Sequence, residues 1–206
     1  MTRLGFTFAR LLRQEAPLTR LSAPREALLA ELADKTVALV GNARSLSDRS
    51  DGAVIDAADL VIRINRAPMP LAQSHGTRTD WLALATSLST AELDRIAPAR
   101  ILWMSYKRKR LPWRVASTPG FYLHPLPDWQ HLRDQLGAPP TTGLMLIDLL
   151  AQSRLSRLDL YGFDFFATLS LTGSRTAGQV PHDFAAERRF VETLSARDPR
   201  IALTRD

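Results

Sequence analysis

The chain has 206 residues, a formal net charge of +6 and no cysteine. This length fits one domain, or one domain with an N-terminal appendage, and 45% apolar residues permit a sizeable core. Without cysteine, neither disulfides nor thiolate metal sites can form, which favours a reducing, cytoplasmic setting. We find no secretory signal and no apolar stretch near the roughly 18 residues that span a membrane. The positive charge has three possible explanations: a general attraction to anionic partners, a basic cleft for a phosphorylated substrate, or a bias of the coding sequence towards arginine without functional meaning.

Residues 1–34 are predicted to form an N-terminal helical arm, ahead of a domain spanning 35–206. In this arm Phe6, Ala9, Leu12 and Ala16 share helical spacing, with arginines between them. An amphipathic helix of this kind either rests on an anionic membrane surface, which would involve residues 1–25, or packs as an ordinary helix or loose arm. A second helix is expected over 25–32, directly after a proline.

The stretch 36–68 carries the clearest local signals. A β-branched apolar run predicts a strand over 36–40, and a second strand is expected over 60–64. A short helix over 52–57, capped by Asp51, would connect them. Asn42 and Asn65 each follow directly after one of these strands. Ligands of open α/β sheets bind beyond the carboxyl ends of the strands, so we expect both amides to converge on one ligand.

Strands and helices alternate along the remainder of the chain. This alternation predicts an α/β fold: a single domain with a mostly parallel, Rossmann-like sheet flanked by helices. A capping box of Ser89 and Glu92 begins one of the helices. The further strands are expected over 79–85, 100–105, 158–161 and, at an edge, 201–203, and the further helices over 90–96, 128–136, 144–152 and 183–196.

Two segments lack a clear assignment. The segment 107–127 is rich in proline and aromatic residues, and 165–180 has the composition of a flexible loop. The basic run 107–110 is interpreted as a solvated loop, with nucleic-acid binding as the alternative; strongly salt-dependent binding would indicate the latter.

Several common chemistries are excluded by missing motifs. There is no P-loop, no Gly-x-Gly-x-x-Gly after the first strand and no Gly-x-Ser-x-Gly elbow. No His-x-x-x-His or paired-aspartate pattern offers a metal site.

Two further places offer chemistry. Thr141, Thr142 and Gly143 begin a helix, where free N–H groups favour a phosphate or carboxylate, although plain N-capping explains the threonines equally well. His182 lies at a loop-to-helix junction with Glu187 five residues later. A histidine that titrates near neutrality suits general-base catalysis there; the alternative is a capping histidine and a surface glutamate. His131 is expected on a helix surface, and His75 and His124 in loops.

Three segments together resemble the sialyltransferases of glycosyltransferase family 29. VALVGNARSL through DLVIRINRAP resembles that family's large sialyl motif. PTTGLMLIDLL through LDLYGFDFF resembles the small motif, and PHDFAAE resembles the very small motif. They occur in the family's order, and the similarity covers residues 35–191. Each motif alone is weakly specific, whereas the series is specific.

The resemblance implies a GT-A-like fold and an inverting glycosyltransferase that needs no divalent metal or other cofactor. It would transfer a sialic-acid-like sugar, Neu5Ac or Kdo, from CMP to a glycan or glycolipid hydroxyl. By resemblance, Asn42 and Asn65 contact the nucleotide and its phosphate, residues 141–143 hold the donor, and His182 deprotonates the acceptor. Supporting roles would fall to Gly41, Arg66 and Glu187.

The chain departs from the family in two ways. Family members usually join the large and small motifs by a disulfide, and this chain has no cysteine. The family's third motif is not visible between Phe165 and Pro181. The absent disulfide suits a cytoplasmic, bacterial-type relative. If residues 1–25 rest on a membrane, the protein would be peripheral to the inner membrane face. The absent motif keeps a second hypothesis open, a CMP-binding module without transferase activity.

Overall fold

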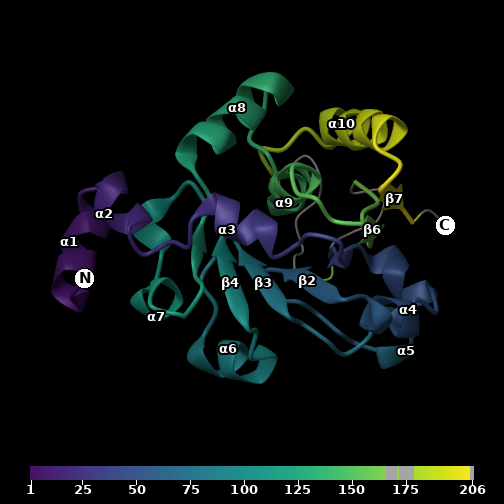
Figure 1. The fold of residues 1–206 in the computed structure, drawn as a ribbon, viewed down its shortest axis with the longest axis horizontal. Coiled ribbons are helices and arrows are strands. Elements are labelled where there is room, and N and C mark those ends of the chain that lie inside the picture. Colours follow the sequence, from purple (N-terminus) through teal and green to yellow (C-terminus); the bar gives the residue numbers. More distant parts are fainter. Residues whose placement is uncertain (166–170, 172–178, 205–206) are drawn as a thin grey trace.

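A computed structural model describes residues 1–165, 171 and 179–204 (Figure 1). In this part of the chain, all strands belong to one seven-stranded sheet with the order β5-β4-β3-β2-β1-β6-β7, and every pair is parallel. The α/β fold predicted from the alternation of elements is confirmed. The strands are β1 (Thr36–Val40), β2 (Leu60–Ile64), β3 (Trp81–Leu84), β4 (Arg100–Trp103), β5 (Tyr122–Leu123), β6 (Arg157–Tyr161) and β7 (Ile201–Leu203).

Helices cover both faces of the sheet (Figure 1). They are α1 (Arg3–Leu11), α2 (Glu15–Thr19), α3 (Arg25–Ala30), α4 (Gly52–Ala57), α5 (Ala72–His75), α6 (Thr90–Ile96), α7 (Trp113–Ala116), α8 (Leu126–Leu136), α9 (Thr142–Ala151) and α10 (Phe184–Arg197). Short 3₁₀ helices in the described connections include η1 (Arg44–Asp48) and η2 (Arg108–Arg110). One core joins α3, α8, α9 and α10 to the sheet, and two others lie under α1, α2, α6 and α7, and under η1 and α4.

Strand β1 shows that the sheet is buried on both of its faces. Val37 and Leu39 are buried in the core on the α9 side, whereas Ala38 and Val40 are buried in the core on the α4 side. Successive side chains of a strand point to opposite faces, so a strand covered by helices on both sides is apolar throughout. This is the continuous apolar run that the sequence displays.

The order in which strands are added to the sheet reverses between β1 and β6, although the two strands are parallel. From β1 the chain builds the sheet outward to β5, then returns to place β6 on the other side of β1. Such a switch point opens a crevice at the carboxyl ends of the two strands. Here Gly41 and Gly162 leave β1 and β6 in close contact, with Ala43 N donating to Gly162 O over 3.2 Å. A Cβ on Gly41 would lie 2.3 Å from Gly162 O, so the approach requires glycine.

Local sequence signals place most element ends correctly. Strands β1, β2 and β7 and helices α4 and α6 have the predicted bounds, and the Ser89–Glu92 capping box is present. Other bounds differ from the prediction by one or two residues: β3 and β4 are shorter, α3 ends at Ala30, α8 begins at Leu126, and β6, α9 and α10 are shifted at one or both ends. The Asp51 side chain does not cap α4 but pairs with Arg49. Most of 165–180, interpreted as a flexible loop, lies outside the described residues.

The basic run after β4 is not a solvated loop throughout. Arg108 is buried, and its guanidinium pairs with Glu15 and donates to the carbonyls of Ser105 and His124. The basic run was interpreted from neighbouring residues alone, whereas the acidic partner of Arg108 is in α2, far away in the sequence. The neighbouring Lys107, Lys109 and Arg110 are exposed, as expected.

The first 34 residues pack against the sheet through α1, α2 and α3. Phe6, Ala9 and Leu18 are buried in the core that includes Trp103. The predicted apolar face is therefore half right: Phe6 and Ala9 face inward, but α1 ends at Leu11, and Leu12 and Ala16 are exposed. None of the helices that the structure describes is both long and apolar enough to cross a membrane.

Candidate functional site

A cavity of about 240 Å³ opens at the carboxyl ends of β1, β2 and β6. Of the nine residues singled out from the sequence, eight line it: Gly41, Asn42, Asn65, Thr141, Thr142, Gly143, His182 and Glu187. The ninth, Arg66, does not; it is exposed and lies 3.4 Å from the Glu92 carboxylate. The cavity lies at the switch point of the sheet, where a ligand of an open α/β fold is expected.

The two asparagines are held differently. Asn65 adopts a left-handed backbone conformation (φ 53°), and its Oδ1 accepts a hydrogen bond of 3.0 Å from the Ala85 amide. Its Nδ2 group donates to no other part of the chain that the structure describes. Asn42 is buried, and its Nδ2 lies 3.5 Å from Ile64 O. Both side chains line the cavity, as expected for residues that follow neighbouring parallel strands.

The N-terminus of α9 points into the same cavity. Thr141 caps this helix, because its Oγ1 accepts from Leu144 N over 3.1 Å. The N–H groups of Thr142 and Gly143 belong to the first turn and so have no intrahelical acceptor. Together with the helix dipole, these donors favour an anion at this end of the cavity.

Glu187 links α10 to the same helix end. Its carboxylate accepts from Thr141 N and from Thr141 Oγ1, both over 2.7 Å. In a capping box the third helical residue supplies this carboxylate; here the third residue is a leucine, and a glutamate 46 positions from the cap takes its place. The glutamate is buried, which excludes the surface alternative. Burial raises the pKa of Glu187 from 4.5 to about 7, against the two hydrogen bonds from Thr141, which lower it.

His182 lies just before α10 and is half-buried. Its Nδ1 is 2.7 Å from Pro139 O, in the loop that leads into α9. Because a carbonyl oxygen can only accept, Nδ1 carries the proton, and the lone pair of the neutral ring is on Nε2. A ring held in this way can take a proton from a hydroxyl group in the cavity.

Sequence reasoning gave no role to the residues that follow β6. Phe163, Asp164 and Phe165 all line the cavity. A Cβ on Gly143 would lie 2.6 Å from Phe163 Cε1, so this glycine is needed for the aromatic ring as well as for any anion. Gly41 and Gly162 each follow directly after a central strand, and this shared pattern could have indicated from the sequence that the residues after β6 line the cavity.

The other histidines lie outside the cavity. His131 is exposed on α8, as predicted. His75 and His124 are almost fully buried, and His75 ends α5 rather than lying in a loop. Among the described residues, no group of three or more His, Asp or Glu side chains could hold a metal ion.

Comparison with known proteins finds one matching family model. The family model of glycosyltransferase family 29 (sialyltransferase) matches residues 8–109, which include the asparagine loops. The segments around α9 and α10 lie beyond this match, so their assignment to the site depends on the geometry. A comparison with curated protein sequences finds no match.

Solved sialyltransferase structures share the fold. A mammalian sialyltransferase in complex with Gal-beta-1-3GalNAc-ortho-nitrophenol superposes with a TM-score of 0.60 at 17% identity, over 96% of this chain and 85% of that one. The sialyltransferase CstII from Campylobacter jejuni, in complex with the substrate analogue CMP-3FNeuAc, gives a TM-score of 0.55 at 15% identity, over 82% and 81% of the two chains.

The fold is thus the α/β fold of GT-A-like glycosyltransferases. More specifically, the chain is similar to the sialyltransferases of glycosyltransferase family 29, whose model matches just under half of it, and it is a CMP-sugar-dependent glycosyltransferase.

Proposed function

We propose that this enzyme transfers Neu5Ac or Kdo from its CMP donor to a glycan hydroxyl, with inversion and without a divalent metal. One observation supports this most directly: two amides, a helix N-terminus and a histidine from four separate chain segments line a single cavity. Neu5Ac and Kdo both carry a carboxylate at the anomeric carbon and leave CMP behind, so the same polar groups serve either donor.

In the proposed reaction His182 Nε2 takes the proton of the acceptor hydroxyl. The acceptor oxygen forms a bond to the anomeric carbon, while the bond from that carbon to the CMP phosphate oxygen breaks on the opposite face. The departing phosphate keeps the electron pair, and the N–H groups of Thr142 and Gly143 stabilise its charge. Donors of this kind can take the place of a metal ion, because they are already oriented before the charge develops.

The direct test compares His182→Ala with His131→Ala. We expect His182→Ala to lower sugar transfer by about 10²–10⁴-fold, the usual contribution of a general base. CMP affinity should stay nearly unchanged, because the nucleotide contacts are elsewhere. His131→Ala removes an exposed histidine outside the cavity and should keep full activity. Equal transfer by both variants would refute the role of His182.

Ligand binding separates failure of the catalytic assignment from failure of the donor assignment. Thermal shift with CMP, CDP, UDP and ADP, with and without EDTA, should show stabilisation that is selective for CMP and insensitive to EDTA. CMP binding without transfer to any of a broad set of acceptors would instead indicate a nucleotide-binding module. A preference for UDP together with a divalent ion would reject the proposed donor. The anomeric configuration of the product, read by NMR, tests inversion.

A further inference from the structure

The outer face of α1 is apolar and open to solvent. Leu4, Phe8 and Leu11 recur at intervals of four and three residues, so they share one side of the helix. Their exposed fractions are 68%, 58% and 50%, and Leu12, at the helix end, is 66% exposed. Phe6 and Ala9 occupy the opposite side and fill the core. Helix α1 is therefore apolar on two sides, and only one of them is covered.

Exposed cations adjoin the C-terminal end of this helix. Arg13, just past α1, lines one cavity together with Lys107, Lys109 and Arg110 of the η2 segment. The cavity's acidic residue, Glu15, already pairs with Arg108. Within the described part of the chain, none of the four exposed cations forms an ion pair with an acidic side chain. We call these cations and the apolar side chains of α1 the α1–η2 surface.

We propose that the α1–η2 surface docks on an anionic phospholipid bilayer. The apolar row of α1 would enter the boundary between headgroups and acyl chains, and the adjoining cations would contact headgroup phosphates. A soluble anion would use the cations but leave the apolar row exposed. A second copy of the chain, paired about a two-fold axis, would bring the same positive surface against itself. Only the bilayer complements both parts.

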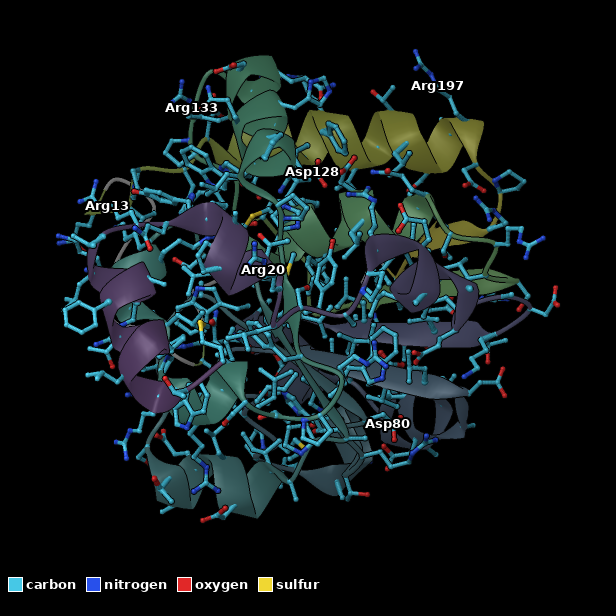
Figure 2. The ribbon with its side chains drawn as sticks, turned by 60° about the vertical axis from the view of Figure 1, so that its left-hand side comes forward. Arg13, Arg20, Asp80, Asp128, Arg133 and Arg197 are labelled. Carbon is cyan, nitrogen blue, oxygen red and sulfur yellow. The ribbon has the colours of Figure 1, made fainter. Side chains whose placement is uncertain are left out.

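The surface is placed on the side of the molecule where the cavity opens. Segment η2 follows β4. In a parallel sheet the carboxyl ends of all strands lie at the same end of the sheet, so the α1–η2 surface and the candidate site lie at that end. Figure 2 shows Arg13 at the periphery next to α1, far from Arg197 at the end of α10 and from Asp80, which precedes β3. Positive residues on α10 therefore provide controls on a distant surface.

The experiment is cosedimentation of the full chain with vesicles. We expect binding to phosphatidylcholine vesicles that contain phosphatidylglycerol, weak binding to phosphatidylcholine alone, and loss of binding at high salt. Phe8→Ser/Leu11→Ser and Lys107→Ser/Lys109→Ser should each lower the partition coefficient by roughly tenfold or more. Circular dichroism melting curves show whether each variant is folded at the temperature used.

Matched controls remove similar side chains elsewhere. Val54 and Leu71 are apolar and 61% and 58% exposed, and Arg189 and Arg197 are exposed cations on α10. Val54→Ser/Leu71→Ser and Arg189→Ser/Arg197→Ser should bind vesicles like the parent chain. Equal losses in test and control pairs would overturn the proposal, as would equal binding to neutral and anionic vesicles.

Two further outcomes would also overturn it. One is a dimer that forms without lipid and dissociates in Phe8→Ser/Leu11→Ser, measured by light scattering. The other is thermal stabilisation by inorganic phosphate, lost in Lys107→Ser/Lys109→Ser, with no vesicle binding. The proposal is independent of the transfer reaction, and His182→Ala should bind vesicles as the parent does. Vesicle binding can thus fail while transfer to a soluble acceptor succeeds, and the reverse.

Discussion

Two regions that bury polar groups around a histidine differ in their surroundings, because only the one near α9 and α10 lines the candidate site. Near α9 and α10, Glu187 and His182 each fix one part of the loop before α9 and leave atoms directed at solvent-accessible space. Near β2 and α5, Arg63 lies 1% exposed, and its guanidinium donates to the carbonyls of Arg78 and His75. Burial lowers the pKa of Arg63 to about 10.

The difference lies in what the polar groups are bonded to. In the β2–α5 region they satisfy the backbone: Arg63 bonds carbonyls, and Asp56 accepts from the amides of Thr77 and Arg78. In the cavity, helix-end N–H groups and one side-chain amide remain available to a ligand. Buried charge and a nearby histidine therefore do not mark a functional site by themselves. Unused donors that a ligand can reach do mark one; Arg63 Nη1 also has no partner among the described residues, but it is buried.

The largest effect should follow from Gly41→Ala. The new Cβ would lie 2.3 Å from the backbone oxygen of Gly162, and neither strand can move away without separating β1 from β6. We expect a loss of about 3 kcal/mol or more in the free energy of unfolding, the upper end for overpacking, together with loss of CMP binding. Urea unfolding and CMP thermal shift measure the two effects.

A suitable control is Gly5→Ala in α1, where the added Cβ would meet its nearest neighbour, Thr2 Oγ1, at an ordinary 3.4 Å. It should be neutral or slightly stabilising, because alanine favours a helix over glycine. Similar stability losses in both variants would contradict the close approach of the strand ends at the cavity floor.

Arg63→Met tests the other region. Methionine fills most of the volume but leaves the carbonyls of Arg78 and His75 without their donor, which should cost roughly 2–3 kcal/mol. Stability should fall while the CMP dissociation constant and kcat, measured below the lowered Tm, stay unchanged. A selective loss of CMP affinity would show that this cluster also serves the ligand, and the contrast between the regions would fail.

Glu187→Gln should remove a pH dependence of stability. The pKa of this carboxyl is raised by burial from 4.5 to about 7. The folded chain therefore holds a proton that the unfolded chain has lost. This contribution is complete below about pH 4.5 and is lost as the pH rises through about 7, a change of roughly 3 kcal/mol.

Glutamine cannot ionise, but its carbonyl oxygen can still accept from Thr141 N. Urea unfolding at several pH values across this window should give a flatter profile for Glu187→Gln than for the parent chain. Glu26→Gln, at an exposed position on α3, should retain the parent profile. Parallel profiles for the parent chain and Glu187→Gln would contradict the assigned ionisation.

The sequence alone predicts features that depend on neighbouring residues, but not those that depend on distant pairings. Runs of β-branched residues and the Ser89 capping box act over a few positions, and so β1, β2 and α6 were predicted with their observed bounds. Pairings over long distances were missed: Glu187 with Thr141, and Arg108 with Glu15. Strand β5 has two residues, too few for a periodic pattern, and is defined by its pairing with β4. The site residues were predicted from their places after a strand or near the start of a helix, and from the family resemblance; Arg66, chosen with its motif, lies outside the cavity.

The smallest and most selective effect is expected from Asn65→Asp. In the native chain Oδ1 accepts from Ala85 N, whereas Nδ2 has no partner among the described residues. Aspartate keeps the acceptor and, like asparagine, tolerates the left-handed backbone at this position, so the free energy of unfolding should change little. The amide donor is lost, and a hydrogen bond to a charged phosphate accounts for about tenfold in affinity. Isothermal titration should therefore show CMP affinity falling at least tenfold with an unchanged Tm. If Tm fell and affinity did not, Asn65 would belong with Arg63, as a residue that holds the backbone rather than a ligand.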